Sequence, residues 1–172
     1  MIQNKSILLF LPSENFCEQE FLTVKSILQK KGFTLFISSD ANSLCVSSRG
    51  LKVRPDVNIF NINKNNFGAF VILGGKGIIE YWNNKKLKSS VLDFYNNGKV
   101  VASICAAGVI LANSGILRNC EGTVFPEYIK EFQKNGAIYK DQKIVITNKI
   151  ITAQDPSSSV DFANAIADHL IV

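Results

Sequence analysis

The sequence contains little of what most metal and disulfide motifs require. Among its 172 residues there is a single histidine, and the four cysteines match neither a metal-binding spacing nor a dense disulfide framework. We expect free thiols in a reducing, cytoplasmic setting, with no metal and no other cofactor. The four cysteines are Cys17, Cys45, Cys105 and Cys120.

Long hydrophobic runs are also missing. The apolar segment from Ile7 to Leu11 is too short for the core of a signal peptide, and no small-residue cleavage site follows it. No apolar run in the sequence reaches the length of a transmembrane helix. We therefore expect a cytoplasmic protein that makes no contact with a membrane.

No long block of the sequence carries charge of one sign. The formal net charge is +5 and the isoelectric point is about 9.0, but the lysines are scattered along the chain. No helix-turn-helix signal, zinc spacing or pattern of stacking aromatics accompanies them, so a solvated lysine surface is a better explanation than nucleic-acid binding. Hydrophobic residues make up 47% of the chain, which favours one folded domain over residues 1–172 and argues against disorder.

Short apolar runs alternate with segments of helical periodicity. The principal strands are predicted at 7–11, 33–38, 70–73, 100–104, 143–147 and 150–153. Helices are predicted at 17–31, 78–82, 86–96, 106–112, 126–135 and 157–170. A polar hairpin is expected from 43–48 and 51–53, with its turn near Arg49, and a further short strand from 120–125.

This alternation predicts a three-layer α/β sandwich with a mostly parallel central sheet. Ligands of such sheets gather at the carboxyl ends of the strands. Three segments are expected to end there, namely the loop after Leu11, the Gly74-Gly75 turn and the residue Cys105. We therefore expect the functional site where these segments meet.

Cys105 lies between the apolar run 100–104 and the small-residue segment that starts at Ala106. A strand that turns directly into a helix forces a tight, strained bend and exposes the side chain at the bend. The free N–H groups and the dipole at a helix N-terminus stabilise an anion, so the Cys105 thiol should ionise easily and act as a nucleophile. A buried core cysteine explains the same pattern about equally well.

The Gly74-Gly75 turn fits neither a dinucleotide fingerprint nor a phosphate loop. Its bare backbone can approach another group closely. If the turn lies beside Cys105, the N–H groups of Gly75 and Ala106 would form an oxyanion hole. An ordinary tight turn is the simpler explanation of the two glycines.

Two acids and one histidine are candidates for proton transfer. Glu18 and Glu20 open the first predicted helix, where acids complement the dipole; alternatively one of them points toward the Cys105 sulfur and burial keeps it protonated. His169 lies near the end of the last predicted helix, where a surface role at the helix C-terminus is the better explanation. A cysteine–histidine mechanism of the papain type therefore has no evident base.

At this point the residues resemble a known family. The order of Glu20, Gly74-Gly75, 104–108 and 151–156 is similar to that of the ThiJ/PfpI superfamily, in the branch of the Parkinsonism-associated protein deglycase and its small bacterial relatives. The resemblance runs over nearly the whole chain. It implies a flavodoxin-like three-layer sandwich and a homodimer.

The resemblance also implies roles for individual residues. Cys105 would be the reactive, easily oxidised nucleophile, and Glu20 the protonated carboxyl that holds it. Gly75 and Ala106 would supply backbone donors. A binding or dimer-proximal position is implied for Arg49 and Gly74.

Several positions depart from the family pattern. Phe125 stands before Pro126 where many relatives carry a histidine, and Ala106 follows the cysteine where the proteolytic branch carries one. Gln154 and Leu73 replace an arginine and a proline. The loss of both histidines argues against peptidase activity and leaves Glu20 as the candidate acid–base group.

The first hypothesis is an enzyme of the glyoxalase or protein deglycase type, which uses Cys105 and Glu20 on small reactive dicarbonyls or glycated proteins. The alternative is a redox sensor or stress chaperone without enzymatic activity, in which oxidation of Cys105 changes the contacts with a second copy or with client proteins. A thiamine-biosynthetic role, once attached to the superfamily name, finds no thiazole phosphate site in these residues.

Overall fold

Apolar runs covered on both sides form the middle of the sheet. Every residue of β7 (Ala69–Ile72) and β8 (Val100–Ile104) is buried, as expected for parallel strands with helices on both faces. The computed structural model describes residues 5–41 and 43–171, and β8 and β7 lie next to each other in the interior of the central sheet.

The central sheet has seven strands in the order β11-β12-β8-β7-β1-β3-β6. All neighbouring strands run parallel except β11, which is antiparallel to β12 at one edge. The predicted α/β class with a mostly parallel sheet is thereby confirmed. The other strands of the sheet are β1 (Ser6–Phe10), β3 (Thr34–Ser39), β6 (Val57–Asn58), β11 (Ile144–Thr147) and β12 (Ile150–Ala153).

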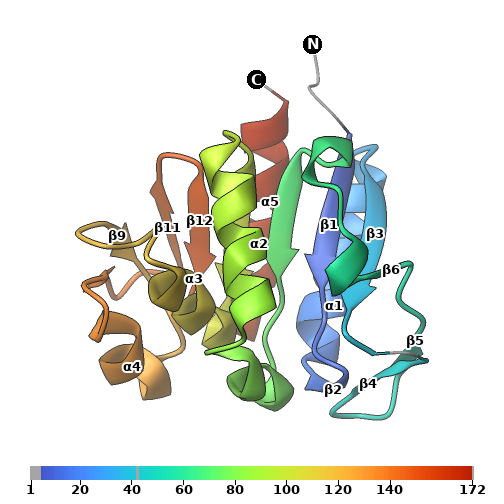
Figure 1. Cartoon of the computed structure of the whole chain (residues 1–172), viewed down its shortest axis with the longest axis horizontal. Coiled ribbons are helices and arrows are strands. Elements are labelled where there is room, and N and C mark those ends of the chain that lie inside the picture. The colour runs from blue at the N-terminus through green and yellow to red at the C-terminus, as the bar shows by residue number, and fades with distance from the viewer. Residues whose placement is uncertain (1–4, 42, 172) are drawn as a thin grey trace.

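Helices cover the two faces of the sheet. In Figure 1, α2 and α3 lie in front of the strands while α1 and α5 lie behind them, where they pack against each other. The α-helices are α1 (Glu18–Lys30), α2 (Lys85–Asn96), α3 (Gly108–Ser114), α4 (Ile129–Gln133) and α5 (Ser159–Leu170). In the part of the chain that is described, none of them is long and apolar enough to cross a bilayer.

Short 3₁₀ turns precede several helices. Three of them stand where the sequence predicts the first turns of helices, around Ala106, Pro126 and Ser157, and a fourth stands in place of the helix predicted at 78–82. The Asp155 side chain accepts a 2.8 Å hydrogen bond from the Ser157 N–H, with Pro156 next to it, so the predicted start of the last helix is confirmed. The 3₁₀ turns are η1 (Ile59–Asn61), η2 (Lys64–Asn66), η3 (Lys76–Tyr81), η4 (Cys105–Ala107), η5 (Pro126–Tyr128) and η6 (Pro156–Ser158).

Two small sheets lie outside the central one. The predicted hairpin is present as β4 (Cys45–Ser47) and β5 (Lys52–Val53), and β2 (Glu14–Phe16), which was not predicted, pairs with β4. The strand predicted at 120–125 is limited to β9 (Glu121–Gly122), which pairs with β10 (Ile138–Tyr139). The strands β2 and β10 have only two or three residues, too few for an alternating pattern, which is why the sequence did not reveal these two.

Candidate active site

The candidate site forms where β7 and β8 end. These two strands are parallel neighbours, and Ile72 is paired with Ser103 near their carboxyl ends. The Gly74-Gly75 turn and Cys105 therefore leave the sheet side by side, as the sequence predicted. The start of α1 joins them, because the Cys17 N–H donates a 3.0 Å hydrogen bond to the Gly74 carbonyl.

Cys105 occupies the predicted sharp bend. Its φ of +60° lies in the left-handed region, which is strained for a residue with a side chain. Trp82 fixes the bend from outside, because its indole Nε1–H donates a 2.9 Å hydrogen bond to the Ala106 carbonyl. The prediction of an exposed side chain is wrong, since Cys105 keeps only 9% of its surface exposed. It nevertheless borders a cavity, so it is accessible to a small molecule.

Glu20 is the acid that points inward. It has no exposed surface, and its Oε2 accepts a 2.6 Å hydrogen bond from the Gly74 N–H. Burial raises the pKa of this carboxyl to about 8, against the lowering effect of the Gly74 N–H and the nearby Cys17 and Cys105 thiols. Glu18 instead turns toward the 45–53 hairpin, where the Ser47 hydroxyl donates a 2.6 Å hydrogen bond to its Oε2.

The sequence predicted that the Cys105 thiol ionises easily, but its environment in the structure opposes ionisation. Burial raises its pKa most, and the charge of an ionised Glu20 raises it further. The Ala106 and Gly75 N–H groups act in the opposite direction and lower the pKa. The prediction considered the helix terminus and omitted desolvation, which is the larger effect here.

The backbone of the Gly74-Gly75 turn lies close to the neighbouring segments of the site. A Cβ added to Gly74 would lie 2.8 Å from the Cys105 Cβ and 3.0 Å from Glu20 Oε2. Gly75 has a φ of +111°, and a Cβ there would lie 2.5 Å from the Cys17 backbone nitrogen. Side chains at these two positions would therefore push the surrounding segments of the site apart.

A cavity of about 280 Å³ opens onto these groups. Glu20, Cys105, Gly75 and Ala106, four of the predicted site residues, all border it. Sequence reasoning missed Cys17 and Tyr128 as site residues, because neither stands in a recognisable local motif. The complete lining consists of Cys17, Glu20, Gly75, Lys76, Cys105, Ala106, Phe125, Glu127, Tyr128 and Pro156.

Cys17 is a second thiol at this cavity. It is half-buried and forms the N-terminal boundary of α1. Burial raises its pKa to about 11, and the charge of an ionised Glu20 adds to the effect. Glu20 therefore has a thiol on each of two neighbouring segments, and both thiols are predominantly protonated at neutral pH.

Other predicted residues lie outside the cavity. Gly74 contacts Glu20 through its backbone N–H but does not border the cavity. Arg49 is exposed on the 45–53 hairpin, where its backbone N–H donates to the Ser47 hydroxyl. His169 contacts the Ala165 carbonyl within α5, near the amino ends of β8 and β12. It therefore lies at the other end of the sheet from Cys105. Among residues 5–41 and 43–171, no group of three or more histidine, cysteine and acidic side chains is arranged to hold a metal ion.

Comparison with known proteins gives one consistent result. The model of the DJ-1/PfpI family matches residues 5–169. A deglycase of Pyrococcus horikoshii is 27% identical over 149 residues, which cover 87% of this chain and 90% of the relative. A glutathione-independent glyoxalase of Caenorhabditis elegans is 24% identical over 173 residues, which cover 99% of this chain and 91% of the relative. The crystal structure of a ThiJ/PfpI domain protein from Brachyspira murdochii superposes with a TM-score of 0.96 at 28% identity, with 98% of each chain covered.

Proposed function

The chain belongs to the DJ-1/PfpI family, and from this premise we propose that it converts reactive dicarbonyls, or the early adducts they form with proteins, through Cys105 and Glu20. The relatives named deglycase and glyoxalase support a DJ-1-type function in general. One observation carries the finer proposal. A fully buried carboxyl that keeps its proton at neutral pH lies between a backbone N–H and the side of the cavity that contains the two thiols.

The nucleophile forms from a coupled pair of groups. The Glu20 carboxyl, whose raised pKa is about 8, is the first of the two groups to lose its proton. The thiol proton can then move to this carboxylate and leave the sulfur as a thiolate, which the Gly75 and Ala106 N–H groups stabilise. Glu20 then donates a hydrogen bond to the thiolate in place of repelling it.

The thiolate adds to the aldehyde carbon of a dicarbonyl. A sulfur–carbon bond forms, the carbonyl electron pair moves to oxygen, and the oxygen takes up a proton to give a hemithioacetal. The Gly75 and Ala106 N–H groups stabilise the developing oxyanion. Glu20 supplies the proton, because it is the one acid among the lining residues that is buried and protonated at neutral pH.

A proton shift and a hydrolysis complete the reaction. Ionised Glu20 removes the proton of the former aldehyde carbon and returns it to the adjacent carbonyl carbon, while the hydroxyl proton on the former aldehyde carbon moves to the ketone oxygen. A thioester of a 2-hydroxy acid forms. Water then cleaves the thioester and returns the Cys105 thiol and the free hydroxy acid. The aldehyde carbon is oxidised and the ketone carbon reduced within one molecule, so no external oxidant or reductant is consumed.

The test is the conversion of methylglyoxal to lactate by the purified protein. We expect Cys105→Ala to remove turnover and Glu20→Gln to reduce it at least about a hundredfold, as for loss of a general acid–base group. Cys120→Ala is the matched control, since Cys120 is a free, half-buried thiol outside the cavity. Equal rates for the wild-type protein and Cys105→Ala would refute the proposal.

The Oε1 atom of Glu20 favours a second function, that of a redox sensor. This atom is buried, and no partner in the described residues meets hydrogen-bond geometry with it. Oxidation of the Cys105 thiolate by two molecules of peroxide would give a sulfinate and two waters. Protonated Oε1 could then donate to a sulfinate oxygen, which supports the redox-sensor alternative. Mass spectrometry after mild peroxide treatment should find Cys105 oxidised before the other three cysteines, and uniform oxidation of all four would exclude this role.

A further inference from the structure

The cavity contains an aromatic surface that the reaction itself does not require. We propose, on the basis of the function above, that the preferred substrate is an α-oxoaldehyde with an aryl substituent, such as phenylglyoxal, and that Phe125 and Tyr128 determine this preference. Small polar dicarbonyls such as glyoxal would react at the same cysteine without using this surface.

The chemistry of the lining supports an uncharged, apolar substituent. Phe125, Tyr128 and Pro156 each border the cavity and each remain partly exposed. The two charged residues of the lining other than Glu20 are Lys76 and Glu127, which have opposite signs and are exposed to solvent. No buried cation is present among these lining residues to select an anionic substituent, whereas the rings offer apolar surface that a ligand can cover.

The rings form a continuous cluster. The Phe125 and Tyr128 ring centroids lie 5.9 Å apart, and Trp82 meets Tyr128 edge-on at 5.1 Å. Trp82 does not border the cavity, so it supports Tyr128 from behind. Two hydrogen bonds to backbone carbonyls set the position of this cluster relative to the nucleophile. The Phe125 N–H donates to the Cys105 carbonyl, and the Trp82 indole N–H donates to the Ala106 carbonyl.

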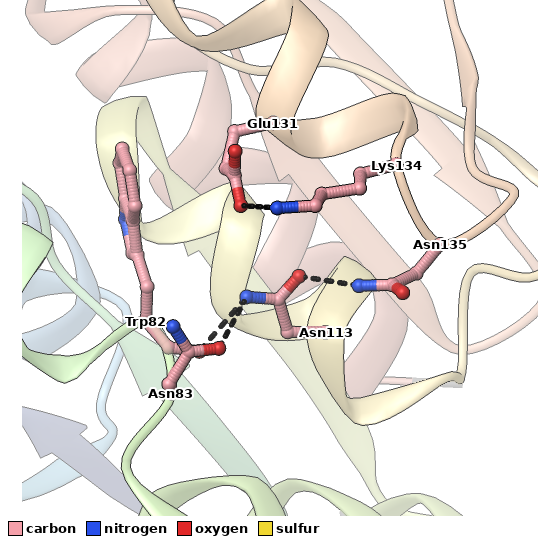
Figure 2. Close-up of polar contacts among 6 residues, drawn as sticks. All are labelled: Trp82, Asn83, Asn113, Glu131, Lys134 and Asn135. Atoms are coloured by element: carbon pink, nitrogen blue, oxygen red, sulfur yellow. Dashed lines mark hydrogen bonds and ion pairs between the residues drawn. The ribbon is translucent and has the colours of Figure 1, made fainter.

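A polar network around Asn113 supports the cluster, and Figure 2 shows this network beside Trp82. The Asn113 side chain donates to the Trp82 carbonyl at 3.0 Å and to Asn83 Oδ1 at 3.3 Å, and it accepts a 2.7 Å hydrogen bond from the Asn135 amide. Asn135 follows α4, the helix that continues from Tyr128. The two segments that carry Trp82 and Tyr128 are therefore tied to α3 through one side chain, so the aromatic surface is preformed.

The size of the cavity limits the substrate. Its volume of about 280 Å³ lies just below the usual range of about 300–1,000 Å³ for small-molecule pockets. A two-carbon dicarbonyl head at Cys105 with one ring against Phe125 and Tyr128 matches such a space. Aromatic contacts of this kind change affinity about twofold to tenfold beyond simple burial.

The experiment compares phenylglyoxal with glyoxal. We measure kcat/KM for both substrates in the wild-type protein, Phe125→Leu and Tyr128→Leu, and in Phe60→Leu as a matched control, because Phe60 is 64% exposed and lies outside the cavity. We expect the ratio of phenylglyoxal to glyoxal to fall about fivefold in each cavity variant and to stay at the wild-type value in the control. An unchanged ratio in both cavity variants, with turnover still dependent on Cys105, would overturn the aryl preference and leave the proposed function intact.

A binding measurement covers the case in which a variant is inactive or unstable. Acetophenone has the aryl ketone group without the aldehyde, so it can occupy the cavity without reacting. We expect it to slow alkylation of Cys105 by iodoacetamide in the wild-type protein, while acetone at the same concentration has no effect. Equal protection by both ketones, or by neither, would overturn the inference. Absence of Cys105-dependent turnover with any dicarbonyl would overturn the proposed function as well.

Discussion

Glu20 Oε2 accepts a 2.6 Å hydrogen bond from the backbone N–H of Gly74. This contact joins the first turn of α1 to the segment that follows β7, and it fixes the carboxyl beside the thiol of Cys105. Substitution by any residue other than proline keeps a backbone donor, so the position of the acid is set by the fold itself. The properties of the site then depend on the protonation of Glu20.

The raised pKa of Glu20 predicts how stability depends on pH. The folded protein holds the proton up to about pH 8, whereas the unfolded chain releases it near the ordinary value of 4.5. The folded state therefore binds more protons between these values, and the contribution of Glu20 to stability is complete below pH 4.5 and is lost as the pH rises to about 8. The expected slope of the unfolding free energy is about 1.4 kcal/mol per pH unit at most, the value for one proton.

Glu20→Gln should remove this slope. Urea unfolding at about pH 5, 6, 7 and 8 would show a stability that declines with pH in the wild-type protein and declines less in the variant. Glu18→Gln is the matched control, because Glu18 lies in the same first turn of α1 and accepts from the Ser47 hydroxyl outside the cavity. Parallel slopes for the wild-type protein and Glu20→Gln would mean that Glu20 titrates as an ordinary exposed carboxyl.

The shared proton also predicts the pH profile of Cys105 alkylation. In the wild-type protein the rate of reaction with iodoacetamide should rise with a midpoint near pH 8, where the Glu20–Cys105 pair loses its first proton. In Glu20→Gln the amide cannot take the proton of the thiol, and burial alone opposes ionisation. The midpoint should therefore move upward by at least about one pH unit.

This measurement is cleanest in a background that lacks the other thiols. Cys17→Ala is needed because Cys17 borders the same cavity, and Cys45→Ala and Cys120→Ala remove the remaining free cysteines. Mass spectrometry of the alkylated peptide then assigns the rate to Cys105. An alkylation midpoint that is the same with and without the Glu20→Gln change in this background would exclude proton sharing.

Much of the fold could be predicted because its signals are local. The run 100–104, the small residues after it and Gly115 at φ +89° define strand, bend and helix within a short stretch of sequence. The alternation of such units indicates the parallel sheet. Glu20 could be assigned only through the resemblance, since nothing in the first helix itself distinguishes it from Glu18.

The rest of the site depends on contacts between distant segments. Tyr128 borders the cavity because the Phe125 N–H ties its segment to the Cys105 carbonyl, and Trp82 packs against Tyr128 from the segment after β7. Neither Tyr128 nor Trp82 lies in a periodic sequence pattern that would predict this contact between their rings. The thiol pKa was mispredicted for the same reason, because desolvation is a sum over many residues that are remote in sequence.

Gly75 should tolerate no side chain. In Gly75→Ala the new methyl group would clash with the Asn15 carbonyl oxygen and would lie 2.5 Å from the Cys17 nitrogen, and the φ of +111° is unfavourable for alanine. We expect a loss of more than about 2 kcal/mol of unfolding free energy, together with loss of Cys105-dependent turnover. Gly115→Ala shares the positive φ but has nothing within 4 Å, so it should cost about 1 kcal/mol and leave turnover unchanged. Equal destabilisation by the two variants would show that backbone strain alone matters at Gly75.

Asn113 should act as a positioning residue for the aromatic surface. Asn113→Ala removes the hydrogen bonds to Trp82, Asn83 and Asn135 that Figure 2 shows, and water can replace part of them because Asn83 and Asn135 are exposed. We expect a loss of about 1–2 kcal/mol, measured by urea unfolding.

The kinetic signature separates positioning from a general loss of stability. If the network only supports the fold, KM for phenylglyoxal should stay constant at temperatures where Asn113→Ala remains folded. If it also aligns Tyr128, KM should rise about threefold to fivefold while kcat changes less, because the ring contacts act on binding and the proton transfers remain with Glu20. Lys134→Ala is the matched control from the same region: its ion pair with Glu131 is 3.4 Å long and largely exposed, and such pairs contribute little. A rise in KM of equal size in both variants would assign the effect to α4 as a whole and not to the Asn113 network.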